Sequence, residues 1–159
     1  MIRMGIGYDV HATGKGRPLM LGCVHFDDAT VSLDGHSDAD VVSHAICDAL
    51  LGAAALGDIG MHFPDTDAQW RGADSRVFVR HIRELLGAQG FAIVNVDATV
   101  LAEAPRLGKH RQTMREYIAA DLQLALDRVS VKATTSEGLG FIGRREGLAC
   151  HAIALLEKE

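Results

Sequence analysis

Cysteine and proline are scarce in this sequence, and the cysteine pattern excludes two classes of protein. The three cysteines in 159 residues are widely spaced and form no C-x-x-C pair. Such cysteines are typical of reduced thiols in a protein core, and not of a disulfide framework or a zinc knuckle. Only 3 residues are proline whereas 17 are glycine. This balance predicts loops in which the backbone lies close to a ligand.

An excess of basic residues and a long hydrophobic segment are also missing. Lys and Arg number 16 against 21 Asp and Glu, a net charge of −5, whereas nucleic-acid-binding proteins carry a basic face. The longest apolar run, 49–56, has eight residues, and about 20 are needed to cross a bilayer. No hydrophobic segment precedes Asp9, so a signal peptide is not expected. We therefore expect a cytoplasmic protein that binds neither nucleic acid nor a membrane.

The sequence alternates between predicted strands and predicted helices, as expected of one domain over residues 1–159. Apolar residues recur every three to four positions in three predicted helices, over 38–56, 74–87 and 109–122. Strands are predicted over 3–11, 18–26, 91–101, 129–133 and 148–156. The pattern favours an α/β fold of the α+β type, with a single sheet of about four strands and helices mainly on one face. The order of the strands stays open.

Local signals predict where these elements begin and end. Ser37 and Asp40 form a possible capping box for the first helix, Gly57 ends that helix, and Asp74 caps the second. Tyr117 is expected on the buried face of the third helix.

Two further segments stand out from this pattern. The last strand, 148–156, is apolar throughout and is therefore expected to be buried. Residues 57–73 have turn residues but no periodicity, and a loop of that length inside a compact domain is more often functional than not.

Polar residues on the first strand and the first helix predict a metal site. Asp9 and His11 are two positions apart, so they project from the same face of a strand. His44 lies on the helix that follows the motif GHSDAD. One carboxylate and two imidazoles are zinc ligands, and three protein ligands leave the open position of a catalytic site. Asp40 and Asp48 lie four residues either side of His44, so either could accept its remaining N–H.

A second polar group, KATTSEGLGFIGRREG, occupies residues 132–147. Its glycines let backbone N–H groups approach a phosphate, and Thr134, Thr135 and Ser136 add hydroxyl donors. Glu137 could hold Mg²⁺ beside those phosphates, because this ion prefers oxygen ligands. The segment lacks the spacing of a P-loop. From composition alone, a glycine-rich turn without a ligand is an equal alternative.

Five motifs, taken in order, resemble the 2-C-methyl-D-erythritol 2,4-cyclodiphosphate synthase family. They are GYDVHAT, GHSDAD with the downstream His44, GDIGMHFPDTD, AEAPRL and KATTSEGLGFIGRREG, and they cover essentially the whole chain. The resemblance implies a divalent-metal-dependent, CMP-releasing lyase of the non-mevalonate isoprenoid pathway. In that family, the 2-phosphate of 4-diphosphocytidyl-methylerythritol 2-phosphate attacks the β-phosphorus of the same molecule. The family is a homotrimer with active sites between subunits and an apolar axial channel in which an isoprenoid diphosphate could bind.

The same resemblance implies roles for individual residues. Asp9, His11 and His44 would hold a first metal, Zn²⁺, and Glu137 a second, Mg²⁺ or Mn²⁺, with the substrate phosphates. His36 and Thr135 are implied as the catalytic residues that stabilise the transition state, with Ser37 beside the phosphates. The residues implied at the methylerythritol are Asp58, Ile59, Gly60, Phe63, Pro64, Asp65, Thr66 and Asp67. Those implied at the cytidine, from a neighbouring subunit, are Ala102, Glu103, Ala104, Pro105, Arg106, Leu107, Gly108, Thr134 and Thr135. Further substrate contacts are expected from Ser136, Phe141 and Arg144, the last two toward the trimer axis.

The cytidine segment departs from the family pattern at two positions. Glu103 stands where a glutamine is more common, and Arg106 where a lysine is common. Arg106 keeps the positive charge but presents a planar fork of donors, so its contact with the ligand would differ.

Two other functions are compatible with parts of this pattern. A zinc phosphohydrolase could use the same three ligands to cleave a nucleoside diphosphate, giving a linear product that contains solvent oxygen. A non-catalytic trimer could instead bind isoprenoid diphosphates in an axial channel, and replacing His44 would then leave turnover and metal content unchanged. Neither alternative explains the cytidine-like segment.

Overall fold

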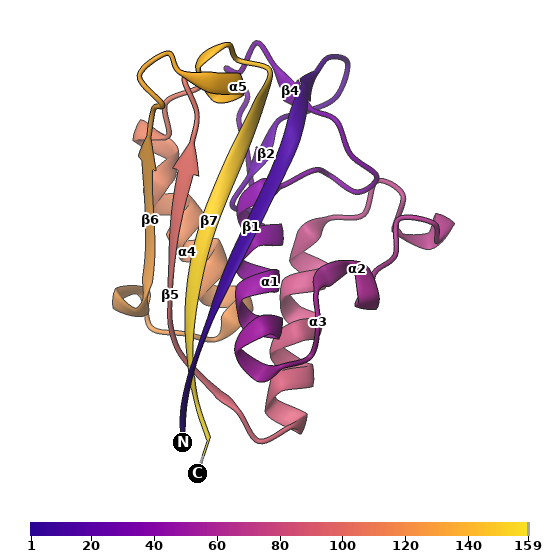
Figure 1. The fold of residues 1–159 in the computed structure, drawn as a ribbon, viewed down its shortest axis with the longest axis vertical. Helices are drawn as coiled ribbons and strands as arrows, with labels where there is room; N and C mark the ends of the chain where they lie inside the picture. Colours follow the sequence, from indigo (N-terminus) through magenta and orange to yellow (C-terminus); the bar gives the residue numbers. More distant parts are fainter. Residues whose placement is uncertain (159) are drawn as a thin grey trace.

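The computed structural model describes residues 1–158, as one sheet with its helices on one face (Figure 1). The sheet has five strands in the order β4-β1-β7-β5-β6. These strands are β1 (Ile2–Gly14), β4 (Ser32–Leu33), β5 (Ala92–Leu101), β6 (Val129–Thr134) and β7 (Gly147–Glu157). The mixed α/β fold is confirmed, although the sheet has five strands where about four were predicted.

The pairing of the strands brings the two ends of the chain together. β1 and β7 are antiparallel neighbours over their whole length, with Ile2 opposite Glu157 and Asp9 opposite Cys150. β5 is antiparallel to β7 and parallel to β6. Both termini therefore lie at the same end of the sheet, at the bottom of Figure 1.

The predicted strand over 18–26 is a short hairpin outside the main sheet. It joins β2 (Met20–Leu21) to β3 (Val24–His25), two strands of two residues each. The segment therefore has strand structure as predicted, but in two short strands joined by a turn at 22–23.

The helices are α1 (Val41–Ala54), α2 (Ile59–His62), α3 (Ser75–Ala88), α4 (Arg111–Leu122) and α5 (Gly140–Gly143). Short 3₁₀ turns occupy Ala68–Trp70, Gly108–His110 and Leu126–Arg128. In the described part of the chain, no helix combines the length and the apolar character needed to cross a membrane.

Helix α1 packs directly on β1 because two glycines leave room for it. A Cβ atom at Gly7 would lie 1.9 Å from the carbonyl oxygen of Ala45, and one at Gly5 would lie 2.0 Å from that of Ala49. These glycines therefore serve close packing between a helix and a strand, and not contact with a ligand. The close approach brings the first turn of α1 next to the side chains of β1.

The ends of α1 differ from the prediction, whereas the start of α3 matches it. The residue that caps α1 is Asp40, whose carboxylate accepts the N–H groups of Val42 and Ser43, so the capping box from Ser37 is wrong. The helix ends before Gly57, because Ala55 already adopts a left-handed conformation (φ 58°). Asp74 caps α3 as predicted.

Two predictions of burial are wrong in part. Tyr117 is 40% exposed on α4, where the guanidinium of Arg76 lies 4.7 Å from the centre of its ring. β7 is buried on both sides over residues 147–150, but from His151 onward it is buried on one side only, and Ile153 on the other side is half exposed. All three cysteines are buried and free, as predicted.

Over β1 and β7, the side of the sheet that carries no helix is largely apolar, whereas over β5 and β6 it carries polar residues, among them the ion pair of Asp97 and Lys132. We call this side the outer face, and its exposed large apolar residues on β1 and β7 are Ile2, Met4, Ile6, Tyr8, Val10 and Ile153. Met4 and Ile6 are 74% and 70% exposed. Monomeric proteins rarely expose contiguous apolar patches of this kind.

Candidate metal centre and substrate pocket

Asp9, His11 and His44 converge between the sheet and helix α1. Oδ2 of Asp9 lies 3.0 Å from Nε2 of His11 and 3.1 Å from Nδ1 of His44, and these two nitrogens are 3.3 Å apart. Donor atoms bound tetrahedrally to one zinc ion, with bonds of about 2.0–2.1 Å, lie roughly 3.3 Å from one another. The three donor atoms therefore fit a small divalent cation, and their predicted convergence is confirmed.

A backbone carbonyl sets the orientation of His11. Nδ1 of His11 lies 2.7 Å from the carbonyl oxygen of Asp34. Because a carbonyl only accepts hydrogen bonds, Nδ1 carries the proton and Nε2 presents its lone pair to Asp9 and His44. Gly35 makes room for this ring, since a Cβ there would lie 2.9 Å from Cε1 of His11.

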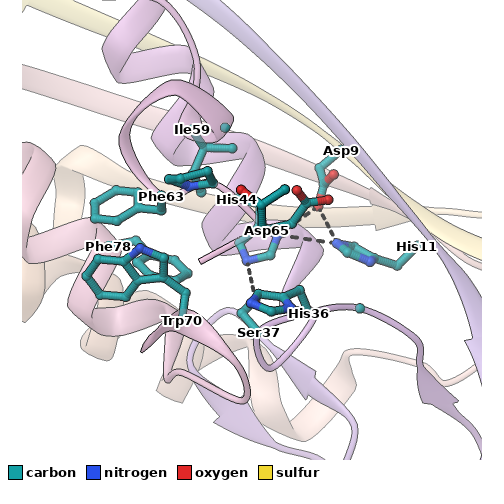
Figure 2. Close-up of a pocket in the computed structure, with 14 residues that line it drawn as sticks. Asp9, His11, His36, Ser37, His44, Ile59, Phe63, Asp65, Trp70 and Phe78 are labelled. Carbon is teal, nitrogen blue, oxygen red and sulfur yellow. Dashed lines mark hydrogen bonds and ion pairs between the residues drawn. The ribbon is translucent and has the colours of Figure 1, made fainter. Parts of the chain in front are cut away.

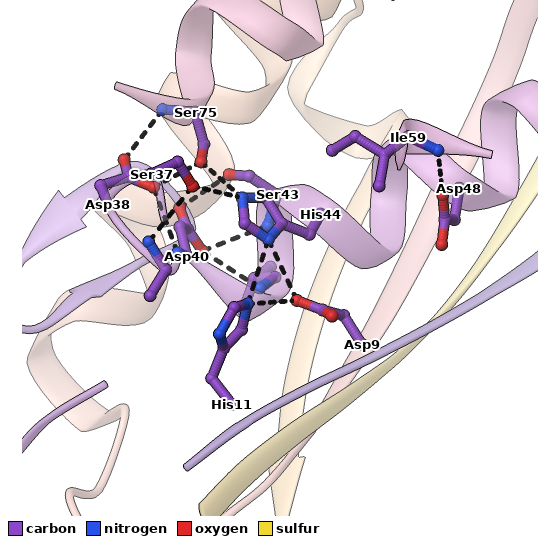
Figure 3. A network of polar contacts seen from close by, with 12 residues as sticks. Asp9, His11, Ser37, Asp38, Asp40, Ser43, His44, Asp48, Ile59 and Ser75 are labelled. Carbon is purple, nitrogen blue, oxygen red and sulfur yellow. Dashed lines mark hydrogen bonds and ion pairs between the residues drawn. The ribbon is translucent and has the colours of Figure 1, made fainter. Parts of the chain in front are cut away.

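Hydroxyl groups set the orientation of His44 (Figure 3). Nε2 of His44 lies 2.9 Å from Oγ of Ser75 and 3.2 Å from Oγ of Ser37. The hydroxyl of Ser75 donates to the carboxylate of Asp38, so it is free to accept the Nε2 proton of His44. Nδ1 of His44 is then left unprotonated and faces the other two ligands. A serine that donates to a partly buried carboxylate is thus the outer partner of this histidine.

Electrostatics within the triad favour the charged carboxylate. Burial raises the pKa of Asp9, but the hydrogen bonds and charges of His11 and His44 outweigh burial and lower it to about 2. Burial lowers the pKa of His11, but Asp9 outweighs that effect and raises it above its usual value. A proton and a metal ion therefore compete for the same donor atoms.

The prediction that Asp40 or Asp48 orients His44 is wrong. Asp40 is fully buried, and its carboxylate accepts backbone N–H groups at 22–23, over 2.8 and 2.7 Å, in addition to capping α1. Oδ1 of Asp48 accepts the N–H of Ile59 at 2.8 Å and so fixes the start of α2. Both carboxylates hold the elements around the site, and neither contacts the imidazole.

The triad opens into a pocket of about 570 Å³, a volume suited to a small organic ligand. Phe63, Trp70 and Phe78 gather on one side of it, while Asp9 and His11 lie on the other (Figure 2). Predicted residues that line this pocket, apart from the triad, are His36, Ser37, Ile59, Gly60, Phe63, Pro64, Asp65 and Thr66.

Two predicted residues of the same stretch have another role. Asp58 caps α2 by accepting the N–H of Met61 at 3.0 Å. Asp67 caps the following 3₁₀ turn by accepting the N–H of Gln69 at 3.0 Å, and its carbonyl oxygen lies 3.0 Å from Nε2 of His36. Their carboxylates are outside the pocket lining, so their contact with a substrate stays a prediction.

A second pocket, of about 550 Å³, collects the residues predicted at the cytidine. It is lined by Ala102, Glu103, Pro105, Arg106, Leu107, Gly108, Arg111, Lys132, Ala133, Thr134 and Thr135. Ala104 lines a smaller neighbouring pocket of about 120 Å³. The first and second pockets share no lining residue. Within one chain, the predicted substrate residues therefore lie in separate pockets.

Comparison with known proteins places the chain in a family. The model of the YgbB family matches residues 2–157. The chain belongs to the YgbB family. A 2-C-methyl-D-erythritol 2,4-cyclodiphosphate synthase from Thioalkalivibrio sulfidiphilus (strain HL-EbGR7) is 57% identical over 156 residues, which cover 98% of this chain and 97% of the relative. A protein of the same name from Stutzerimonas stutzeri (strain A1501) is 57% identical over 155 residues, 98% of each chain.

Solved structures agree with this assignment. IspF from Plasmodium falciparum, in a complex with CDP, matches with a TM-score of 0.86 at 34% identity, over 99% of this chain and 97% of the other. The bifunctional IspDF from Campylobacter jejuni matches with a TM-score of 0.95 at 43% identity, over the whole of this chain. The chain spans 43% of the length of that bifunctional protein.

In this YgbB-family chain, the loop after β6 is held by a residue that was predicted to bind cytidine. Oε1 of Glu103 accepts the backbone N–H groups of Ser136 and Gly138, over 3.0 and 3.3 Å. These hydrogen bonds lower the pKa of Glu103. Glu137 lies beside the hydroxyl of Thr135, with 3.3 Å between the two oxygens.

The remaining predicted residues lie on the segment between β6 and β7. Phe141 is on α5 and is 39% exposed, and Arg144 pairs with Glu146 over 2.9 Å. Neither residue lines the triad pocket or the second pocket. Their substrate contacts stay predictions.

Several residues of the site were missed by the analysis of the sequence. Ser75 and Asp38 orient His44, and Phe78 and Trp70 contribute to the apolar wall of the pocket. Ser75 follows the helix cap Asp74 directly, so its position predicted a helix start and nothing more. No local spacing links it to His44, 31 residues earlier.

Proposed function

We propose that this chain converts 4-diphosphocytidyl-2-C-methyl-D-erythritol 2-phosphate into 2-C-methyl-D-erythritol 2,4-cyclodiphosphate and CMP. An oxygen of the 2-phosphate forms a bond to the β-phosphorus. The bond from that phosphorus to the bridging oxygen breaks, and this oxygen leaves on CMP. The observation that carries the proposal is the convergence of Asp9, His11 and His44 on one pocket, in a chain 57% identical to proteins that bear the name of this synthase.

The reaction depends more on the positioning of the reacting groups and on charge stabilisation than on acid–base catalysis. The attacking phosphate oxygen is already an anion near pH 7, so it needs no strong general base. The barrier comes from repulsion between phosphates and from the freedom of a flexible sugar alcohol. When bound, divalent cations, Zn²⁺ at the triad and Mg²⁺ or Mn²⁺ near Glu137, would supply positive charge beside the phosphates.

The residues around the triad fix and enclose the reacting groups. His36 is held by the carbonyl of Asp67, so its ring has a fixed direction at the pocket wall. We assign His36, with Thr135, to stabilising the charge that develops during phosphoryl transfer. The aromatic wall of Phe63 and Trp70 covers the opposite side and limits the access of water.

A homotrimer explains why the two groups of substrate residues are separate in one chain. The triad pocket has no lysine or arginine in its lining, whereas the second pocket has Arg106, Arg111 and Lys132. A substrate with a methylerythritol phosphate at one end and a nucleotide at the other needs both pockets. We infer that the second pocket of one chain completes the triad pocket of a neighbour, so that each single catalytic domain, 1–159, contributes to two sites.

The outer face supports the same assembly. Its exposed apolar residues, which include Met4, Ile6 and Ile153, would line the axis of a trimer and so be removed from water. An apolar channel built from this face would also have room for the hydrocarbon chain of an isoprenoid diphosphate.

Phosphorus NMR of the reaction mixture tests the proposal directly. The purified protein is incubated with the diphosphocytidyl substrate, in ¹⁸O-labelled water, with and without a chelator. We expect a cyclic diphosphate and CMP in equal amounts, no solvent oxygen in either, and no turnover once the divalent ions are removed. A linear phosphorylated product that carries solvent oxygen would instead identify a phosphohydrolase.

A further inference from the structure

Arg17 binds the backbone of the loop that carries His36 and Ser37. Its Nη1 donates to the carbonyl oxygen of Gly35 at 2.7 Å, and its Nη2 donates to that of Ser37. The carbonyl oxygen between them, on His36, accepts the N–H of Gly72 at 2.8 Å. Three successive carbonyl groups of the loop are therefore bound by the protein itself.

This loop contacts both imidazoles of the metal centre. The carbonyl of Asp34 accepts from Nδ1 of His11, and Oγ of Ser37 lies 3.2 Å from Nε2 of His44. Gly35 lies so close to His11 that a Cβ on it would be 2.9 Å from Cε1 of the ring. A small displacement of the loop would therefore move the outer partners of two metal ligands together.

The guanidinium group suits this task better than another cation. Its planar fork presents several N–H donors in fixed directions, so it can bridge two carbonyl oxygens that lie on either side of one residue. A lysine ammonium is a single point of charge and cannot span both with the same geometry. The guanidinium also brings positive charge, half-buried, to a loop at the edge of a pocket proposed to take phosphates.

We propose that Arg17 is a positioning residue of this active site. By bridging the carbonyls of Gly35 and Ser37, it holds the outer hydrogen bonds of His11 and His44 and the direction of His36. The catalytic part of this proposal rests on the proposed function, whereas its effect on metal binding does not.

The contribution of the bridge can be separated from that of charge with a matched variant. Lys15 lies in the same turn, two residues before Arg17, and its side chain is exposed. Lys15→Met removes the same charge from the same turn. Arg17→Met removes charge and bridge together, and Arg17→Lys keeps the charge but loses the bridge.

The experiment measures Zn²⁺ affinity by competition with a chromophoric chelator, and kcat and KM for the diphosphocytidyl substrate at saturating Zn²⁺ and Mg²⁺. Losing an outer partner of a metal ligand typically costs about 10–100-fold in affinity or activity. We expect Arg17→Met to weaken Zn²⁺ binding and to lower kcat by about tenfold each, with KM changed less than about threefold. We expect Arg17→Lys to lose part of both, and Lys15→Met to stay within about twofold of the parent protein.

Three results would overturn the proposal. The first is an Arg17→Met variant with parental Zn²⁺ affinity and kcat. The second is a Lys15→Met variant with equal losses, which would assign the effect to charge alone. The third, decisive if Arg17→Met does not fold, is an Arg17→Lys variant that matches the parent protein in both measurements. If the parent protein binds Zn²⁺ but does not turn over the substrate, the proposed function fails, and the Zn²⁺ affinities still decide the role of Arg17.

Discussion

At the scale of single residues, hydrogen-bond partners decide which nitrogen of each histidine faces the metal. The carbonyl of Asp34 fixes the tautomer of His11, and the hydroxyl of Ser75 fixes that of His44, because this hydroxyl donates its own hydrogen bond to Asp38. The pairing of Asp9 with His11 could be predicted from the sequence, because a D-x-H on a strand has a fixed geometry, and the motifs added His44. Their outer partners could not be predicted, because Ser75 and Asp34 reach the site only through the packing of other elements.

Replacing Ser75 therefore tests whether the hydroxyl supports the metal ligand. We expect Ser75→Ala to weaken Zn²⁺ binding by about tenfold, because the Nε2 proton of His44 loses its nearest acceptor. Ser130→Ala, on an exposed position of β6, is the matched control and should leave the affinity unchanged. Competition with a chelator measures the Zn²⁺ affinity of both variants. Equal affinities for the two variants would show that Ser75 does not orient His44.

The buried cysteines predict how stability depends on pH. Burial raises the pKa of Cys23, Cys47 and Cys150. The unfolded chain releases these protons above pH 9 while the folded chain keeps them, so the free energy of unfolding falls as the pH rises. Each thiol contributes a slope of about 1.4 kcal/mol per pH unit in that range.

Denaturant unfolding between pH 8 and 11 measures this slope, with a reducing agent present. We expect Cys47→Ala to flatten it by about 1.4 kcal/mol per pH unit, because one buried thiol is gone. An unchanged slope in the variant would mean that Cys47 ionises equally in both states.

At the scale of elements, the packing of α1 on β1 brings the metal ligands together. Gly5 and Gly7 let the helix approach the strand, and this approach sets His44 beside Asp9. The helices could be predicted from their periodicity, as could the start of α3. The end of α1 could not be predicted, because Ala55 adopts a conformation that glycine usually takes and Gly57 follows too late.

Two glycine variants test the contact between helix and strand. Gly7→Ala should destabilise the fold by about 3 kcal/mol or more, because its Cβ would overlap the carbonyl of Ala45. Gly87→Ala, in α3, has open space around its Cβ and should gain about 0.5–1 kcal/mol from helix propensity. Thermal or denaturant unfolding measures the stability of both variants. A Gly7→Ala variant as stable as the parent would show that α1 can shift away from β1 at little cost.

At the scale of the whole molecule, the outer face and the two separate pockets both support the trimer proposed above. The motifs predicted the residues of both pockets, and the resemblance implied that a neighbouring subunit supplies the second. The strand order could not be predicted, because pairing between β1 and β7 joins residues from opposite ends of the sequence. The expectation that the last strand is buried was wrong from His151 onward, because no helix covers the outer face there.

A charge on the outer face tests the assembly. Ile6→Glu should convert the trimer to monomers, because a carboxylate in an apolar interface loses its hydration. Turnover should fall at least about 100-fold, while the Zn²⁺ affinity of each chain stays within about threefold, since the triad is complete in one chain. Val77→Glu, on the exposed side of α3, is the control. Sedimentation velocity gives the masses, and a monomeric parent protein, or a trimeric Ile6→Glu variant, would contradict the proposed assembly.

Calorimetric titration of the metal-free protein with Zn²⁺ tests the binding of one divalent cation by Asp9, His11 and His44 most directly. We predict one ion per chain for the parent protein and for His25→Ala, whose imidazole is exposed on β3. For His44→Ala, we predict the loss of this binding, in a protein that still folds. Parental binding by His44→Ala, or no binding by the parent protein, would contradict the metal centre on which the proposed function depends.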